Sequence, residues 1–386
     1  MLKNIVVGMD IGTYSIRVVV SSYVKGAAAP TIMGTSISPS RGLKHGYIIN
    51  GRDAIKSVRS AIKIAEQSSG VKIKSVFLSI GGISLESIIS PGSIQISRAD
   101  EEVTELDIQK AISASREGLR NMANRKIIDT IPIRFKLDGK EVLGKPERMK
   151  GGKLEVKTLF ITCLEQHIND LVHAVEGAGV EVEDIIASPI AASLVALSKR
   201  QRTVGCLLAN IGAETVSISV FEDDIPISLQ VFPIGSTDIT NDIALGLRIP
   251  LEEAEKIKVE GTGGAYPKRK LDEIIEARLS DIFELIEAHL KKIGRSGLLP
   301  AGIIITGGGA GISTIKDFAK ASLKLPTKIA TSVFLSQNTK HARDSSWFVA
   351  YGLCIFGFEQ SREAKGVQAM RNVGKHIISW IKQILP

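Results

Sequence analysis

Two stretches of the chain, about 200 residues apart, share one sequence plan. Val6–Val19 reads VVGMDIGTYSIRVV, and Leu207–Val220 reads LLANIGAETVSISV. In each stretch an apolar run leads through a glycine turn, at Gly12 or Gly212, into a second run that alternates apolar and polar residues. This pattern predicts a β-hairpin whose tip contains glycine and leaves backbone N–H groups free. The repetition predicts a chain built from two related halves.

The composition is that of an ordinary folded protein. The chain has 386 residues, enough for two or three domains with hydrophobic cores. Its 44% apolar and 23% charged residues argue against disorder, collagen and a coiled coil. The 36 glycines and 5% aromatic residues favour an α/β protein over one that binds single strands by stacking. The net charge of +8 permits contact with nucleic acid or an anionic membrane and selects neither.

Cysteine and histidine usage excludes several classes of protein. Cys163, Cys206 and Cys354 are far apart and form no CxxC pair, which argues against a disulfide framework or zinc ribbon. We therefore expect the protein to lie in the reducing environment of the cytosol. The six histidines are equally scattered, so we expect no histidine metal site. The first apolar stretch is too short for a signal peptide, and no apolar run reaches the ~18 residues of a membrane span. We expect a protein that is neither exported nor integral to a membrane.

The first half is interrupted by a region with a different pattern of expected strands and helices. Apolar spacing predicts a helix at 51–69, then a strand at 71–80 that leads into two glycines. Residues 84–160 predict a compact α+β insertion. Its expected elements are strands at 87–97, 127–137 and 154–162, and a helix that follows the acidic stretch 100–107 and ends near Met122. A helix at 165–177 and a strand at 180–186 resume the first half.

The second half repeats the same order of elements. We expect a hairpin at 204–232, a helical stretch at 236–259 interrupted near Pro250, a long helix at about 271–293 and a strand at 302–306. Residues 345–358 form an apolar segment too short to span a membrane, and we expect a buried helix that returns to the first half. A polar linker at 359–366 and a terminal amphipathic stretch follow.

Three glycine turns carry the candidate chemistry. No GxxxxGK[ST] is present, which excludes a P-loop, and the glycines after Thr306 do not fit GxGxxG. Each turn, at 10–13, 210–215 and 306–309, instead follows an apolar strand. Two facing hairpin tips can cradle a phosphate chain with backbone N–H donors. Asp10 can hold a hydrated magnesium ion, which prefers one or two carboxylates together with water and phosphate oxygens. The alternative is that each turn is only a structural hairpin.

These turns resemble those of the actin/Hsp70/hexokinase nucleotide-binding superfamily. Four further motifs narrow the resemblance to the FtsA family of bacterial cell-division actin homologues, over essentially the whole chain. They are PSRGLKHG at 39–46, SIGG at 79–82 leading into Glu86–Ser87, GSTDITNDIA at 235–244 and AEKIK at 254–258. The implied fold is α/β, with two duplicated RNase H-like (actin-like) domains around a nucleotide cleft, an inserted α+β subdomain and a C-terminal amphipathic helix.

The resemblance also implies a division into subdomains. The implied segments are 1–83, 161–200 and 340–358 for subdomain IA, 84–160 for the inserted subdomain IC, 201–235 and 295–339 for IIA, 236–294 for IIB, 359–366 for a linker, and 367–386 for a membrane-targeting helix.

ATP and Mg²⁺ are the cofactors that the resemblance implies, and it assigns the residues around them. Asp10, Gly12, Thr13 and Tyr14 would form the first phosphate loop, with Asp10 at the metal and Arg17 as a basic phosphate contact. Asn210, Gly212, Ala213, Glu214 and Thr215 would form the second loop. Glu255 and Lys258, neighbours on a helix, would reach the ribose and base, and Gly307, Gly308 and Gly309 would lie under the nucleoside. Without the resemblance, the better interpretation is an ordinary solvated charge for Arg17 and an ordinary helix pair for Glu255 and Lys258, and the family context reverses it.

One position departs from the family pattern. Asn210 stands where the family has aspartate, and Ser188 in the segment resembling the family's connecting loop offers no carboxylate to orient water. An amide can hydrogen-bond a hydrated ion but cannot act as a base. We therefore expect tight nucleotide binding with weak or absent ATPase activity.

The C-terminal stretch is the second chemical feature. Apolar residues recur there at spacings of three and four, with Arg371, Lys375 and Lys382 elsewhere on the helical wheel. Apolar bulk, a tryptophan and basic flanks suit a helix in the headgroup region of anionic lipid, and the alternative is a terminal helix docked on its own domain. The residues expected to contact lipid are Met370, Val373, Ile377, Trp380, Ile381 and Ile384.

The family resemblance implies a cytoplasmic protein on the inner face of the cell membrane at the division site. It would polymerise, tether filaments of the tubulin-like FtsZ and contact later division proteins through the inserted subdomain, with no nucleic-acid partner. Lys291, Lys292 and Arg295 are candidates for binding the acidic FtsZ C-terminal tail, although such a charge run also fits a solvated face. The alternatives are a PilM-like actin homologue of pilus assembly and a small-molecule kinase of the same superfamily.

Overall fold

The computed structural model describes residues 4–24, 26–27, 29–261, 263–264, 266–332 and 344–364. Within them the chain forms two five-stranded sheets of the same design, with strand orders β11-β6-β1-β2-β3 and β14-β13-β12-β15-β16. In each sheet the first three strands along the chain are antiparallel neighbours, and two later strands add parallel to the first of them. This matched topology confirms the predicted duplication.

Most strands of the two sheets lie close to the predicted limits, whereas β3 and β16 were not predicted. The first sheet contains β1 (Asn4–Ile11), β2 (Ser15–Tyr23), β3 (Thr31–Pro39), β6 (Ser75–Ile80) and β11 (Glu181–Ala187). The second contains β12 (Cys206–Ile211), β13 (Val216–Glu222), β14 (Ile225–Phe232), β15 (Ile303–Thr306) and β16 (Thr327–Ile329). A small two-stranded sheet, β4 (Leu43–Lys44) and β5 (Tyr47–Ile48), lies between β3 and the first helix in sequence.

Helices cover the first sheet on both faces. Helix α1 (Gly51–Ser69) begins where the Asn50 side chain accepts a hydrogen bond from the Asp53 amide, and it ends at Gly70 in the left-handed conformation. Its apolar stripe packs on β3 and β2, and α3 (Glu165–Glu176) lies beside it. Both helices occupy the predicted ranges.

Two buried helices join the halves. All nine residues of α4 (Ser188–Ala196) are buried, and α11 (Phe348–Ala364) packs against α4 and β1. The contact is so close that a Cβ at Gly352 would overlap the carbonyl oxygen of Ala191. The core around these helices includes Leu208 and Ile304 of the second sheet, so one continuous core spans both halves. Helix α11 runs through Ala364, so residues 359–364, expected to be linker, are helical, in keeping with their Glu, Gln, Arg and Ala content.

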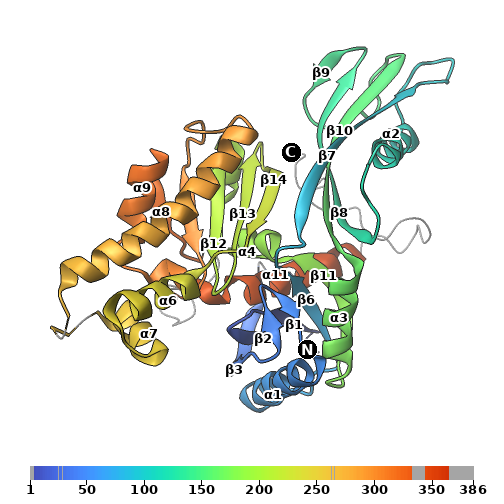
Figure 1. Cartoon of the computed structure of the whole chain (residues 1–386). Coiled ribbons are helices and arrows are strands. Elements are labelled where there is room, and N and C mark those ends of the chain that lie inside the picture. The colour runs from blue at the N-terminus through green and yellow to red at the C-terminus, as the bar shows by residue number, and fades with distance from the viewer. Residues whose placement is uncertain are drawn as a thin grey trace.

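The insertion forms its own layer of structure. Its antiparallel sheet has the order β7-β10-β8-β9, and α2 packs on β7 and β10 over a small separate core. The elements are β7 (Glu86–Gln95), α2 (Glu105–Glu117), β8 (Arg125–Leu137), β9 (Lys140–Val142) and β10 (Lys153–Leu164). Thr104 and Asp107 form a capping box at the start of α2, and the helix ends at Gly118, earlier than the predicted Met122. Figure 1 shows this subdomain projecting away from the two halves.

Helices also cover the outer face of the second sheet, and Figure 1 shows them on the side opposite the insertion. The long helix α8 buries a stripe from Leu271 to Leu290 in the core of this half. The described helices of this half are α5 (Lys199–Val204), α6 (Ser236–Leu247), α7 (Leu251–Glu260), α8 (Lys268–Lys292) and α9 (Ile315–Leu323), with the short 3₁₀ turn η1 (Gly308–Gly311). A second 3₁₀ turn, η2 (Ser345–Trp347), directly precedes α11. Across the described ranges, we find no helix with both the length and the apolar character that crossing a bilayer requires.

Candidate nucleotide site

A cavity of about 90 Å³ lies between the two halves. It forms where the carboxyl ends of β1, β6, β11 and β12 meet, which is where open α/β sheets bind ligands. The first half contributes Asp10, Ile11, Gly12, Thr13, Gly46, Gly81, Gly82, Leu171 and Ser188, and the second contributes Asn210, Thr215 and Ser217. The two predicted hairpin turns therefore border one cavity.

The two turns have the same backbone geometry. In the first, the Gly12 amide donates to the Ser15 carbonyl at 3.2 Å, and in the second, the Gly212 amide donates to the Thr215 carbonyl at 2.9 Å. Asp10 lies opposite Arg17 in the first hairpin, and Asn210 lies opposite Ser217 in the second. The duplication therefore extends from the sheets to the individual turns.

Asp10 is the carboxylate of the cavity. Burial raises the pKa of this carboxyl, while a 2.6 Å hydrogen bond from Ser79 Oγ and the nearby charge of Arg17 act in the opposite direction. The lining residues that the structure describes include no lysine, arginine or second carboxylate. One carboxylate among hydroxyls, an amide and glycine N–H groups suits a hydrated Mg²⁺ that brings its own waters and phosphate ligands. A closed cage of three or more His, Cys, Asp or Glu side chains does not occur among the described residues.

Asn210 and Ser188 come from opposite halves of the chain. Both line the cavity. The Asn210 amide also lies against Gly307, where a Cβ would overlap Asn210 Oδ1, and Gly307 has a φ of +88° that favours glycine. The third glycine turn is thus packed directly behind the second.

Several predicted residues lie outside the cavity lining. Tyr14 is 70% exposed, and the Arg17 guanidinium lies over the Trp347 ring at 5.8 Å from its centroid. Arg17 Nε is buried without a hydrogen-bond partner. Among the other residues assigned to the cleft, Gly212, Ala213, Glu214, Glu255, Lys258, Gly307, Gly308 and Gly309 do not line this cavity.

Glu214 connects the halves directly. Its Oε2 accepts a hydrogen bond from the His45 amide at 2.6 Å, and its carbonyl oxygen lies 3.1 Å from His45 Nδ1. The next amide, that of Gly46, donates to Thr13 Oγ1 at 3.2 Å. The loop at 45–46 therefore touches both hairpin turns.

Glu255 and Lys258 form the predicted neighbouring pair on α7, with an ion-pair distance of 2.7 Å. Lys258 also donates to Thr240 Oγ1 at 2.8 Å and to the Ser236 carbonyl at 3.1 Å. The Ser236 amide in turn donates to the Gly212 carbonyl at 2.9 Å. This chain of bonds holds α6 and α7 against the second turn.

The three basic residues near the end of α8 differ in their surroundings. Arg295 forms a bidentate ion pair with Glu222 of β13, and Lys291 lies 3.7 Å from Glu287. The guanidinium of Arg295 is therefore engaged within the chain. The lipid-contact residues predicted between Met370 and Ile384 lie outside the described residues.

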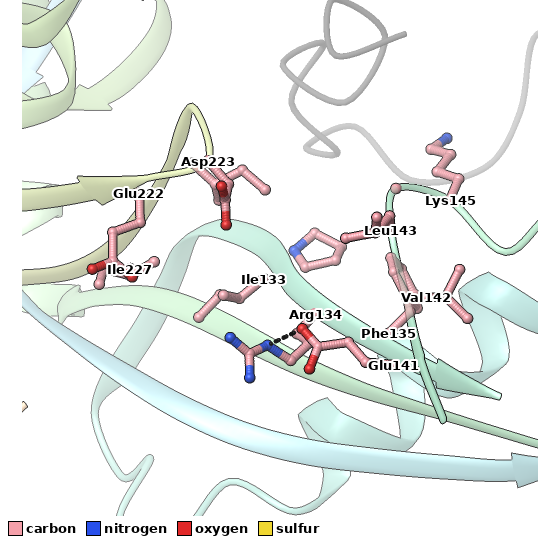
Figure 2. A pocket seen from close by; sticks show the side chains of 13 residues that line it. Ile133, Arg134, Phe135, Glu141, Val142, Leu143, Lys145, Glu222, Asp223 and Ile227 are labelled. Carbon is pink, nitrogen blue, oxygen red and sulfur yellow. Dashed lines mark ion pairs between the residues drawn. The ribbon is translucent and has the colours of Figure 1, made fainter. Parts of the chain in front are cut away.

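A larger hollow of about 260 Å³ opens between the insertion and the β13–β14 hairpin. Figure 2 shows its mainly apolar lining, including Ile133, Phe135 and Leu143, and an ion pair between Arg134 and Glu141 at 3.0 Å. None of the three glycine turns lines this hollow, so the smaller cavity is the better nucleotide candidate.

Sequence reasoning missed part of the site. Ser79, Gly81, Gly82, His45 and Gly46 belong to two motifs, at 39–46 and 79–82, that resemble the family but received no role. The signal was available for Gly81 and Gly82, because they directly follow a predicted strand. It was not available for the loop at 45–46, whose place depends on contacts with residues more than 100 positions away.

Family models match two parts of the chain. The model described as cell division protein FtsA matches residues 207–352, and the SHS2 domain inserted in FtsA matches residues 82–162. The second match agrees with the predicted insertion at 84–160.

Similar proteins of known name point the same way. The cell division protein FtsA of Pseudomonas aeruginosa is 29% identical, over 93% of this chain and 91% of its own length, and that of Borreliella burgdorferi is 31% identical, over 94% and 93%. Among solved structures, a PilM–PilN type IV pilus biogenesis complex has a TM-score of 0.67 at 15% identity, covering 91% of this chain and 98% of that chain. MreB5 of Spiroplasma citri bound to ADP has a TM-score of 0.54 at 15% identity, covering 94% and 98%.

The solved structures share the fold, which confirms the predicted actin-like class, and the sequence relatives decide the family. PilM is similar in structure at low identity, whereas the FtsA relatives match nearly the whole chain, the insertion included. Together with the duplicated glycine turns, these findings place the chain in the FtsA family of actin-like bacterial cell-division proteins.

Proposed function

We propose that the cavity between the halves holds the phosphates of ATP with Mg²⁺, and that the bound nucleotide holds the two halves together. The observation that carries this proposal is the pair of equivalent glycine turns that border one cavity beside a single half-buried carboxylate, that of Asp10. Asp10 would hold the hydrated ion, and the amides and hydroxyls of the two turns would bind phosphate oxygens. The Mg²⁺ ion would neutralise charge that the phosphates bring into the cleft.

Nucleotide binding is tested by calorimetric titration of the full chain with Mg·ATP. We expect Asp10→Asn to weaken binding by about tenfold or more, because a charged ligand of the ion becomes neutral. Asp272→Asn, a similar change on helix α8, is the matched control and should leave the affinity unchanged. Equal affinity of Asp10→Asn and the wild type would contradict the role of Asp10, and no binding by the wild type would contradict the proposal itself.

Turnover should be slow or absent. Both Asn210 and Ser188 line the cavity, and neither side chain can accept a proton from an attacking water as a carboxylate does. We expect Asn210→Asp to hydrolyse ATP faster than the wild type, because it restores a carboxylate in the cavity. Phosphate release of several per minute by the wild-type chain would contradict this expectation.

At the cellular level, we propose that the protein assembles into filaments on the inner face of the membrane. There it would tether FtsZ by binding the acidic C-terminal tail of FtsZ. The support is family membership and the basic amphipathic sequence at 367–386. Liposome co-sedimentation with FtsZ should succeed for the full chain and fail for a chain that ends at Gly366. Equal sedimentation of both chains would remove the tail from the proposal.

FtsZ binding is tested separately with its isolated tail peptide. Lys291 and Lys292 are the first candidates, since Arg295 already pairs with Glu222. Replacing Lys291 and Lys292 by Glu should abolish binding of an acidic peptide. Undiminished binding would place the contact elsewhere.

A further inference from the structure

The inserted subdomain is joined to the body beside the phosphate cavity. The chain leaves β6 through Gly81 and Gly82, which line the cavity, and enters the insertion at Ser84. It returns through Cys163 at the end of β10 and continues into α3. Ser84 and Cys163 thus mark the two crossings, and they lie side by side, with 2.9 Å between Oγ and Sγ. We call these two residues the joint.

His167, on the first turn of α3, connects the joint to the loop at 45–46. Its Nδ1 lies 2.7 Å from Ser84 Oγ, and its Nε2 lies 3.0 Å from the carbonyl oxygen of Gly46. Ser84, Cys163 and His167 are 5%, 0% and 1% exposed, and the His167 ring stacks on Tyr47 at 4.5 Å. The imidazole is therefore fixed on both edges and on one face.

Donor and acceptor roles in this cluster follow from the partners. A carbonyl oxygen can only accept, so His167 Nε2 carries the hydrogen and Nδ1 accepts from the Ser84 hydroxyl. The Ser84 oxygen then accepts from the Cys163 thiol. Burial lowers the pKa of His167 and raises the pKa of Cys163, which agrees with a neutral imidazole and a protonated thiol. Every polar atom of the cluster has a partner.

The same loop is bonded to both hairpin turns, through Thr13 on one side and Glu214 on the other. It is also packed on the strand that leads to the insertion. Gly82 has a φ of +81°, and a Cβ there would lie 2.9 Å from the His45 carbonyl oxygen and 3.0 Å from His167 Cε1. The loop at 45–46 cannot move without disturbing the Gly82 backbone or the His167 ring.

Within the insertion, Arg125 holds the joint in place. Arg125, at the start of β8, donates to the Ser84 carbonyl at 2.7 Å and to Thr162 Oγ1 at 3.2 Å, and pairs with Glu86 at 3.0 Å. A displacement of Ser84 is therefore passed to β7, β8 and β10 together. The described contacts form an unbroken path from Thr13 to the sheet of the insertion.

The geometry points to His167 as a positioning residue that couples occupancy of the phosphate cavity to the setting of the inserted subdomain, through Gly46 on one side and Ser84 on the other. This inference rests on the proposed nucleotide site and goes beyond it. A phosphate group that draws in the turn at Thr13 pulls on the loop at 45–46, and His167 carries the shift to the joint. Because such coupling is reciprocal, a partner that reorients the insertion changes nucleotide affinity by the same factor.

The test is hydrogen exchange of the full chain with and without saturating Mg·ATP, followed in peptides that cover 83–90 and 158–166. We expect nucleotide to slow exchange there about fivefold or more in the wild type. His167→Gln places an amide N–H near the former Nε2 and keeps the bond to Gly46, whereas His167→Asn places its polar atoms near Nδ1 and keeps the bond to Ser84. Each variant breaks the path at one point, so the response at the joint should be lost in both. His173→Gln, an exposed position on the same helix, is the control and should keep it.

The outcomes separate this inference from the proposed function. If the wild type binds Mg·ATP and exchange at the joint is unchanged, or if both His167 variants respond as the wild type does, the coupling is refuted while the nucleotide site stands. If calorimetry shows no binding by the wild type, the nucleotide proposal fails. Hydrogen exchange of the ligand-free protein then decides whether the joint and the loop at 45–46 are linked. In that measurement, Ser84→Ala should raise exchange in residues 42–48, and unchanged exchange there would refute the linkage.

Discussion

Asp129 is a buried carboxyl where the inserted subdomain meets the first half. It lies on β8, is 5% exposed, and accepts one hydrogen bond at 2.7 Å from the Thr130 amide. Burial raises the pKa of Asp129 from 3.8 to about 7; the Thr130 amide lowers it, and the nearby Asp184 carboxylate on β11 adds to the rise. We therefore expect Asp129→Asn, which keeps the shape and removes the charge, to stabilise the protein at alkaline pH.

The size of the gain follows from the two pKa values. A carboxyl whose pKa is raised by folding contributes stability that is fully present below the unfolded pKa, and that stability is lost as the pH rises through the folded pKa. A change from 3.8 to about 7 corresponds to roughly 4 kcal/mol at about 1.36 kcal/mol per pH unit. Roughly 2.7 kcal/mol of this is lost between about pH 5 and about pH 8.5. Relaxation and water entry reduce this ceiling, so we expect at least ~1 kcal/mol.

Urea unfolding of the full chain at these two pH values measures the effect. The stability advantage of Asp129→Asn over the wild type should grow from about pH 5 to about pH 8.5, with equal m-values. Glu147→Gln, an exposed acid in the same subdomain, is the control and should show no such growth. An advantage that stays constant within ~0.5 kcal/mol, or that shrinks as the pH rises, would refute the assignment of a buried, neutral Asp129.

Two further changes test the cleft and the packing between the halves. Asp10→Asn should stabilise the ligand-free protein by about 0.5–2 kcal/mol near neutral pH because it removes a partly desolvated charge, and the gain should vanish as the pH falls toward about 4. Lower thermal stability of Asp10→Asn at neutral pH would show that the carboxylate is structurally required. Gly352→Ala should cost about 1–3 kcal/mol because its Cβ overlaps the Ala191 carbonyl oxygen, whereas Gly311→Ala meets open space and should cost far less in the same urea experiment. Equal losses in the two variants would contradict the close packing of α4 and α11.

Periodicity made much of the fold predictable. Strands β1, β2, β12 and β13 are short apolar runs interrupted by a glycine turn, and their pairing is local, so the hairpins could be read from spacing alone. The insertion was visible because its turns and alternating strands break the helix–strand order of the first half. Element ends were less predictable: α2 stops at Gly118 instead of continuing to Met122, and α11 continues through polar residues to Ala364.

The connections across the cleft could not be predicted in the same way. The bond between His45 and Glu214 joins residues 169 apart, and the bond between Gly46 and His167 spans 121. No local pattern specifies either partner, since an isolated histidine is equally compatible with a solvated loop. Lys258 illustrates the opposite case: its spacing from Glu255 predicted the pair, but only the folded chain shows that the same ammonium also holds Ser236 and Thr240.

The place of the insertion in the chain puts both of its connections to the first half beside the cavity. The parallel strands β1, β6 and β11 end on the same edge of their sheet, and that edge borders the cavity between the two hairpin turns. The insertion begins directly after β6 and ends directly before α3, so both of its crossings lie at this edge. Strand β3 runs antiparallel to β2, and β2 runs antiparallel to β1, so β3 runs in the same direction as β1 and ends on the same edge. The loop at 45–46, which follows β3, therefore lies at this edge and meets Gly82. The strand order thus brings the two hairpin turns, this loop and the joint together. His167 connects the loop to the joint with only two hydrogen bonds, one to Gly46 and one to Ser84.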